Sequence, residues 1–141
     1  EGTFDTLVDL DATSPLRMPA DIAAAVTLLE ESGAGNVLTA MRSRRSPYFN
    51  LVEVDVNGIV HLSKPLSERI VRRQDAPKCY DMNASIYVWR RPVLFQSAGL
   101  FNADTRLYVM PEERSIDIDS EIDFRFVEHL MLSANTGIMS R

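Results

Sequence analysis

The apolar positions in the first part of the chain predict a strand, a helix and a second strand. Residues 6–10 form a short apolar run typical of a buried strand, and residues 36–41 form another. Pro19 suits the first turn of a helix, and Gly33 suits its end. The i, i+4, i+7 spacing of one helical face is kept by Ile22, Val26 and Leu29. This order predicts a βαβ unit and hence a parallel sheet.

The pattern changes in the middle of the chain. Residues 51–62 alternate weakly around Asn57-Gly58, a strong signal for a two-residue hairpin turn. Residues 63–80 are polar, basic and interrupted by proline, which predicts a loop or an extended arm. Loops of this length are usually functional.

The last part of the chain returns to alternating strands and helices. Residues 85–89 and 105–110 are predicted strands, with a short helix over 91–98 between them. Ser120 opens a final helix, with Asp123 three residues later as its capping-box partner. The predicted buried face of that helix consists of Ile122, Phe126, Val127, Leu130 and Met131. Together the elements indicate an α/β fold in one domain.

Composition and charge narrow the class of protein. The chain has 141 residues, 45% of them apolar, which is enough for a core. A net charge of −5 argues against nucleic acid as the main partner. The single cysteine, Cys79, cannot form an internal disulfide and indicates a reducing, cytoplasmic compartment. No apolar run is long enough for a membrane span, and no signal segment is present. Because the chain begins at Glu1, we expect it to be part of a larger protein.

Two carboxylates before the final helix are the strongest chemical signal. In an extended segment residues i and i+2 project to the same side, so Asp117 and Asp119 point together. Two carboxylates at one place suit a magnesium ion bound to a nucleotide phosphate. The alternative is that Asp119 caps the helix, whose N-terminus favours a carboxylate. The two roles can coexist.

Other polar residues have functional and structural interpretations. Asp11 follows the first strand, at the sheet edge where ligands bind in α/β folds, or it anchors the turn through backbone N–H groups. Arg73, with Gln74 beside it, lies in the polar arm and suits an anion clamp, or a solvated surface. Asn83 precedes a strand and either reads a substrate group or holds a turn, and Tyr87 lines a pocket or belongs to the core.

Four segments together resemble the acylneuraminate cytidylyltransferase family, the CMP-sialic acid synthetases. Residues 13–17 resemble the TSPLR turn of that family, and residues 73–77 its RQ-x-x-P arm. Residues 83–87 are similar to its NG-x-IY strand, and residues 115–121 to its SIDID-[ST]-E signature. Order and spacing also agree. The resemblance implies a mostly parallel, Rossmann-like sheet of the nucleotide-diphospho-sugar-transferase type, with a protruding hairpin and arm at 46–78 that mediates dimerisation.

The resemblance also implies a reaction and roles for particular residues. The family transfers CMP from CTP to an acidic nine-carbon sugar of the sialic or legionaminic type and releases pyrophosphate. It implies Mg²⁺ held by Asp117 and Asp119, with Asp11 as a possible third ligand, and catalytic roles for Arg73 and Asp119. The residues implied to bind substrate are Ser14, Gln74, Asn83, Tyr87, Leu100 and Phe101.

The resemblance has limits that leave other interpretations open. The basic, glycine-containing loop that holds the CTP phosphates has no counterpart here, so residues 1–141 are expected to be the C-terminal two-thirds of the enzyme, inactive alone. Phe49 and Asp81 stand where some members have a lysine and an arginine, which favours a sugar other than plain sialic acid. The alternatives are a non-catalytic dimerisation or binding fragment, and another transferase that uses the same metal-binding carboxylates.

Overall fold

The fold was analysed in a computed structural model, which describes residues 3–66 and 75–135. The chain divides into two compact units. One unit comprises residues 1–41 and 82–141, and the other comprises residues 42–81. Each unit is described by itself below.

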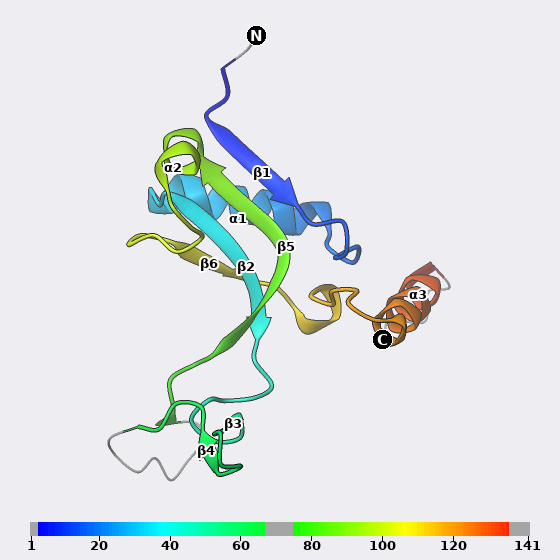
Figure 1. The fold of residues 1–141 in the computed structure, drawn as a ribbon. Coiled ribbons are helices and arrows are strands. Elements are labelled where there is room, and N and C mark those ends of the chain that lie inside the picture. Colours follow the sequence, from blue (N-terminus) through cyan, green and yellow to red (C-terminus); the bar gives the residue numbers. More distant parts are fainter. Residues whose placement is uncertain (1–2, 67–74, 136–141) are drawn as a thin grey trace. The chain divides into compact units, whose positions relative to one another are not determined.

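The first unit is built on a four-stranded sheet (Figure 1). The strands lie in the order β1-β5-β2-β6. Their bounds are β1 Thr6–Leu10, β2 Asn36–Arg42, β5 Tyr80–Arg90 and β6 Arg106–Val109. β1 pairs antiparallel with β5, whereas β2 pairs parallel with β6. The α/β class is therefore confirmed, but the pairing is mixed, and the mostly parallel character is not confirmed. The predicted strands at either end of the βαβ unit are not neighbours, because β5 lies between them.

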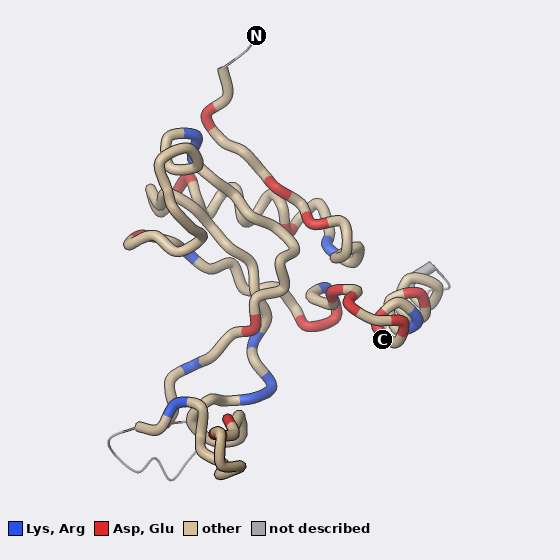
Figure 2. The backbone as a smooth tube through the Cα atoms, viewed as in Figure 1, with Lys and Arg blue, Asp and Glu red and all other residues tan. Residues whose placement is uncertain are grey.

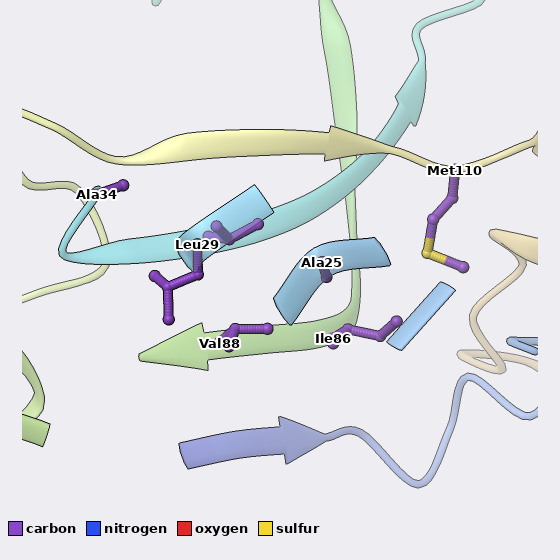
Figure 3. Close-up of a cluster of buried hydrophobic side chains, with 7 residues drawn as sticks. Ala25, Leu29, Ala34, Ile86, Val88 and Met110 are labelled. Atoms are coloured by element: carbon purple, nitrogen blue, oxygen red, sulfur yellow. The ribbon is translucent and has the colours of Figure 1, made fainter. Parts of the chain in front are cut away.

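Helix α1 (Pro19–Ser32) packs on one face of this sheet and forms the core with it (Figure 3). Pro19 stands in its first turn and Gly33, at φ +68°, ends it, both as expected from the sequence. Ile22 and Val26 pack against the core. The buried core residues are Ala25, Leu29, Ala34, Val37, Ile86, Val88 and Met110. Burial of each large aliphatic side chain stabilises the fold by about 1.5–3 kcal/mol.

Helix α2 (Arg91–Gln96), strand β6 and one 3-10 turn (Glu112–Arg114) lie between β5 and the final helix. Helix α2 follows β5 directly, and the 3-10 turn follows β6. Helix α3 spans Glu121–Asn135. Its predicted buried face is wrong for this chain, because only Val127 is buried, whereas Ile122 is 79% exposed. Phe126 and Met131 are also exposed, since no other described element covers them.

The second unit contains the predicted hairpin. Strands β3 (Val52–Val54) and β4 (Val60–Leu62) pair antiparallel. The turn differs from the predicted two-residue turn at Asn57-Gly58. The Gly58 N–H donates to the carbonyl of Asp55, and Gly58 has φ +80°, so the loop is one residue longer and glycine occupies its left-handed position. The Asp55 carboxylate accepts the N–H groups of Asn57 and Ile59, which stabilises this longer turn.

Strand β5 contains one residue with an unusual backbone. Ala84 has φ +50°, a conformation that costs an L-residue with a side chain about 1–2 kcal/mol. It stands at the glycine position of the NG-x-IY pattern that residues 83–87 resemble. The strand is held in this shape by the hydrogen bonds of Asn83 on one side and by the pairing of Ile86 with Leu10 on the other.

We expect Ala84→Gly to stabilise the protein by up to about 1 kcal/mol. Glycine removes the backbone strain at this position, and the greater entropy of glycine in the unfolded chain offsets only part of that stabilisation. Urea unfolding at pH 7 measures the change. Ala23→Gly, in the exposed middle of α1, is the matched control and should destabilise by about 1 kcal/mol. A loss of stability in Ala84→Gly comparable to that of the control would show that Ala84 is not strained.

Candidate functional site

The loop after β1 and the segment before α3 lie side by side in the first unit. The Ile118 N–H donates to the carbonyl of Thr13 at 3.0 Å. The Asp11 N–H donates to the carbonyl of Ser85 in β5 at 3.3 Å. These bonds bring together three of the four segments that carry the family resemblance. The fourth, residues 73–77, belongs to the other unit, and both Arg73 and Gln74 lie outside the described residues.

Asp11 serves as the anchor of its turn. Its Oδ1 accepts the N–H of Thr13 at 3.0 Å and the Thr13 hydroxyl at 2.8 Å. These two bonds hold the pKa of Asp11 below its ordinary value. Arg17 closes the same loop, because its Nη1 donates to the carbonyl oxygens of Asp11, Ser14 and Ser85. The structural alternative for Asp11 is thus realised, and its role as a metal ligand stays a prediction.

Asp117 and Asp119 are left free by the local structure. The cap of α3 is Ser120, whose Oγ accepts the Asp123 N–H at 3.3 Å and donates to the Asp123 carboxylate at 2.6 Å, as the capping box predicts. The Asp119 backbone N–H also donates to the Asp123 carboxylate, but the Asp119 side chain is exposed and forms no part of that cap among the described residues. Asp117 Oδ1 is buried and has no hydrogen-bond partner in the described part of the chain. A buried carboxylate oxygen without a partner is costly, so it points to a ligand or a cation.

The position of this segment is fixed by a buried ion pair. Arg114 donates from Nε and Nη2 to the two carboxylate oxygens of Asp21, at 2.9 and 2.8 Å. Asp21 is fully buried in the first turn of α1, where it also accepts the Met18 N–H at 2.9 Å and the Tyr108 hydroxyl at 3.3 Å. Burial raises the pKa of Asp21, but Arg114 and these hydrogen bonds outweigh burial and hold the pKa below the ordinary value. Arg114 thereby ties the chain three residues before Asp117 to α1.

Asn83 is fully engaged inside the protein. Its Oδ1 accepts the Thr39 hydroxyl at 2.8 Å and the Ser85 N–H at 3.3 Å. Its Nδ2 donates to the Ser115 hydroxyl at 3.0 Å and to the sulfur of Met110 at 3.3 Å. An amide offers two acceptor sites and two N–H donors, so none is left for a ligand in this arrangement. Asn83 holds β2, β5 and the start of the Asp117 segment together, and direct contact with a substrate stays a prediction.

Tyr87 lies among several carboxylates. It is half-buried in β5, directly across from Asp9 of β1. Burial raises the pKa of Tyr87, and the negative charges of Asp11, Asp9 and Asp117 raise it further. The phenol therefore stays protonated and can donate a hydrogen bond. The same carboxylates create a negative potential that favours a cation at this end of the sheet.

Leu100 and Phe101 lie elsewhere on the sheet. Asn36, the first residue of β2, donates from Nδ2 to the carbonyl of Leu100 at 2.8 Å. This bond holds their loop at the start of β2, whereas Asn83 contacts Thr39 farther along the same strand. Both side chains are exposed, Phe101 at 74%. Their predicted role in substrate binding stays a prediction.

Three further observations concern possible metal ligands, Ser14 and membrane helices in the described residues. Within 3–66 and 75–135, no three acidic, histidine or cysteine side chains are grouped so that they could hold a metal ion. The role of Asp11 as a third ligand beside Asp117 and Asp119 stays a prediction. Ser14 is fully buried, and its hydroxyl has no partner among described groups. No helix in these ranges is long and apolar enough to cross a membrane.

The sequence did not identify the residues that hold the site together. Thr39, Asp21 and Arg114 are buried or partly buried polar groups that belong to segments far apart in the sequence. Only Asp21 has a local signal. It lies three residues after Met18, the residue before α1, and an acid at that position can accept the backbone N–H at the start of a helix. Arg114 stands directly before the SIDID-like segment, but nothing in the local pattern names its partner.

Comparison with known proteins agrees with this picture. No family model matches the chain. The chain is 46% identical over 132 residues to post-translational flagellin modification protein B of Campylobacter coli. It is 47% identical over 132 residues to CMP-N,N'-diacetyllegionaminic acid synthase of Campylobacter jejuni. Both matches cover 94% of this chain and 55% of the relative.

A more distant relative gives the same family. N-acylneuraminate cytidylyltransferase of Oncorhynchus mykiss is 29% identical over 131 residues, which cover 91% of this chain and 29% of the relative. The chain is a homologue of the CMP-legionaminic acid synthases and N-acylneuraminate cytidylyltransferases. This recognition, made from the four motifs, is confirmed. The chain spans about half the length of the first two relatives, because each match covers 55% of the relative.

A solved structure supports the fold of this cytidylyltransferase homologue. The structure of 4-diphosphocytidyl-2C-methyl-D-erythritol synthase from Anaerococcus prevotii matches with a TM-score of 0.57. The match covers 91% of this chain and 59% of that one, at 11% identity. At this identity the likeness concerns the fold alone.

The ion pair yields a prediction about stability. Arg114→Met leaves Asp21 buried without its charge partner, so we expect a loss of about 3 kcal/mol in urea unfolding at pH 7. Asp21→Asn removes the other charge of the pair. The double variant Asp21→Asn/Arg114→Met should therefore lose less unfolding free energy than the two single variants together. Arg125→Met breaks only the exposed pair with Glu121 and should cost less than about 0.5 kcal/mol.

The same pair predicts a pH dependence. Because the pKa of Asp21 is lowered in the folded state, its contribution is present above the ordinary value of 3.8 and is lost as the pH falls through the folded-state pKa. The stability of Asp21→Asn should therefore fall less steeply between pH 4 and pH 2 than that of the unaltered chain. Equal slopes would contradict this assignment.

Proposed function

We propose that the complete protein transfers CMP from CTP to an acidic nine-carbon sugar of the sialic or legionaminic type and releases pyrophosphate. The observation that carries this proposal is the pair Asp117 and Asp119, which the helix cap leaves free. The support beyond it is the homology to proteins named CMP-N,N'-diacetyllegionaminic acid synthase and N-acylneuraminate cytidylyltransferase.

The residues present fit a magnesium ion. Mg²⁺ prefers carboxylate oxygens and often takes only one or two of them, with water and substrate phosphates as its other ligands. Asp117 Oδ1 is buried without a partner, and the Asp119 carboxylate is exposed, so one oxygen is set in place and another is accessible. When bound, the ion neutralises phosphate charge and orients the phosphate for attack. Asp117 and Asp119 would hold it, and a two-carboxylate site needs no third acidic ligand.

The surrounding residues have supporting roles in this proposal. Arg114 and Asn83 fix both ends of the stretch 110–115 through Asp21, Ser115 and Met110, so the two carboxylates start from a rigid base. Tyr87 stays protonated beside Asp117 and can donate to a sugar or phosphate oxygen. Arg73 would stabilise negative charge that develops during transfer, as the resemblance implies.

The metal proposal predicts the effect of removing Asp119. In the complete protein, Asp119→Ala should lower pyrophosphate release from CTP by about two orders of magnitude or more, because charge stabilisation at the phosphate is lost. It should also weaken Mg²⁺ binding in calorimetric titration. The assay uses CTP, Mg²⁺ and a panel of sialic, legionaminic, pseudaminic and Kdo acids.

Glu121→Ala is the matched control for this variant. Glu121 is also an exposed acid at the start of α3, but it pairs with Arg125 and has no proposed metal role. Its turnover should be unchanged. If Asp119→Ala keeps the turnover of the Glu121→Ala control, the carboxylate pair does not hold the metal.

The hairpin supports the proposal that the protein is a homodimer. Val52 lies across from Leu62, and Val54 lies across from Val60, so the four aliphatic side chains share one face of the β3–β4 pair. All four are exposed, Val54 at 65%. An isolated two-stranded hairpin with an uncovered apolar face is marginal in water. A second copy that covers this face would remove the apolar side chains from water.

Disrupting this face should therefore give monomers. Val54→Asp places a charge in the apolar face, and we expect the monomer mass in sedimentation at micromolar concentration. Glu53→Lys changes charge on the opposite face of the same strand and should leave the dimer intact. Dimers that persist in Val54→Asp, or an unaltered protein that is monomeric, would contradict the proposed interface.

A further inference from the structure

The unit formed by residues 42–81 contains a hollow of its own. Its volume is about 540 Å³, within the range of small-molecule sites. The hollow is lined by two short stretches that lie next to each other, namely residues 42–46 and residues 76–79. The lining residues are Arg42, Ser43, Arg45, Ser46, Ala76, Pro77, Lys78 and Cys79.

Among the described residues that line the hollow, three side chains are cations and none is an acid. Arg42, Arg45 and Lys78 come from both stretches. Figure 2 shows where Lys and Arg occur along the backbone of this part of the chain. None of the three forms an ion pair with a residue in 3–66 or 75–135. Like charges gathered around a concavity repel one another, and an anion between them relieves that repulsion.

The backbone that carries these cations is held in place. The Ser43 N–H donates to the Cys79 carbonyl at 3.0 Å, which joins the two stretches. The Ser43 hydroxyl donates to the Arg45 carbonyl at 2.6 Å and fixes the turn between them. The Ser46 N–H donates to the Asn50 side chain at 2.7 Å. The hollow is therefore a formed feature of the fold and does not depend on the cationic side chains, which contribute no hydrogen bond to it.

Ser46 adds a neutral donor to the lining. It is 8% exposed, and its Oγ accepts the Tyr48 N–H at 3.3 Å. A hydroxyl that accepts one bond keeps its proton for donation. No described group accepts that proton, so it is available to a ligand oxygen. Arginine adds planar, paired N–H donors that match a carboxylate or a phosphate.

The charges around the hollow are not all positive. An adjoining hollow of about 520 Å³ shares Ser43, Arg45 and Cys79 and is lined also by Asp81. Asp81 does not line the first hollow. Among the described residues, the first hollow is therefore lined by cations without the acid of the adjoining one, and an anionic group is expected there.

We propose that the hollow lined by Arg42, Arg45 and Lys78 is a binding site for a small oxyanion. The ligand is a molecule that carries a carboxylate or a phosphate group. Two sources have this chemistry in the proposed reaction, the carboxylate of the acidic sugar and the phosphates of CTP or pyrophosphate. The site requires neither Asp117 nor Asp119, so it goes beyond the proposed metal centre and can be tested separately from it.

The test is calorimetric titration of the complete protein without Mg²⁺. The probes are inorganic pyrophosphate and N-acetylneuraminic acid, with uncharged N-acetylmannosamine as the ligand control. Arg45→Gln and Lys78→Gln should each weaken binding of the anionic probe about tenfold, because each removes a charge-assisted hydrogen bond. Both side chains are exposed, so folding is preserved, which thermal unfolding checks.

Lys64→Gln is the matched control variant. Lys64 belongs to the same unit, but it lies over the ring of Tyr48 and does not line the hollow. Its affinity for the probes should not change. Asp119→Ala should also keep anion binding while it loses turnover, which separates this site from the metal centre.

The titrations with pyrophosphate and N-acetylneuraminic acid distinguish the possible ligands. Binding of pyrophosphate alone assigns the site to phosphate, and binding of the sugar acid alone assigns it to the substrate carboxylate. Binding of both supports a general oxyanion site. The proposal is overturned if neither anion binds, or if Arg45→Gln and Lys78→Gln bind as the Lys64→Gln control does.

Discussion

A carboxylate buried in a protein interior must be paired, and in this chain the pairing of Asp21 determines where other parts lie. Its partner, Arg114, lies more than ninety positions later and three residues before Asp117. The hydrogen bonds to Met18 and Tyr108 add the start of α1 and strand β6 to the same cluster. The site segment thus takes its position from the interior of the sheet and helix, rather than from its own extended residues.

A second polar cluster, centred on Asn83, also holds the segment before Asp117 in place. Asn83 connects Thr39 of β2 with Ser115 and Met110, and it uses all of its hydrogen-bonding groups to do so. The left-handed backbone of Ala84 follows directly. Beyond that point Tyr87 faces Asp9, while Ser85 accepts bonds from Asp11 and Arg17. The framework of the candidate site is therefore made of residues that contact each other.

The features predicted correctly from the sequence have local causes. Pro19 and Gly33 bound α1, and Ser120 with Asp123 caps α3, because each signal acts within a few residues. The features that were missed depend on contacts between distant segments. The insertion of β5 between β1 and β2 places an antiparallel strand inside a predicted parallel unit. The apolar periodicity of α3 gave its helical character correctly, but periodicity cannot tell whether another element covers that face.

The candidate site shows the same division. The residues Asp117, Asp119 and Ser120 were identified from the motif, and the cap that Ser120 forms with Asp123 agrees with the one expected. The hydrogen-bond partners of Asn83 could not be found from the sequence, because an amide offers the same groups to a substrate and to a neighbouring strand. The turn of the hairpin differs because the Asp55 carboxylate accepts backbone N–H groups, which extends the loop by one residue.

The hollow in residues 42–81 has a consequence for which of its residues can be substituted during evolution. Its shape comes from main-chain and serine hydrogen bonds, whereas Arg42, Arg45 and Lys78 project from it without supporting it. Replacement of these three side chains is therefore expected to leave the fold of this unit unchanged. If the hollow binds an anion as proposed, single substitutions at these positions can alter which anion it prefers without altering the sheet.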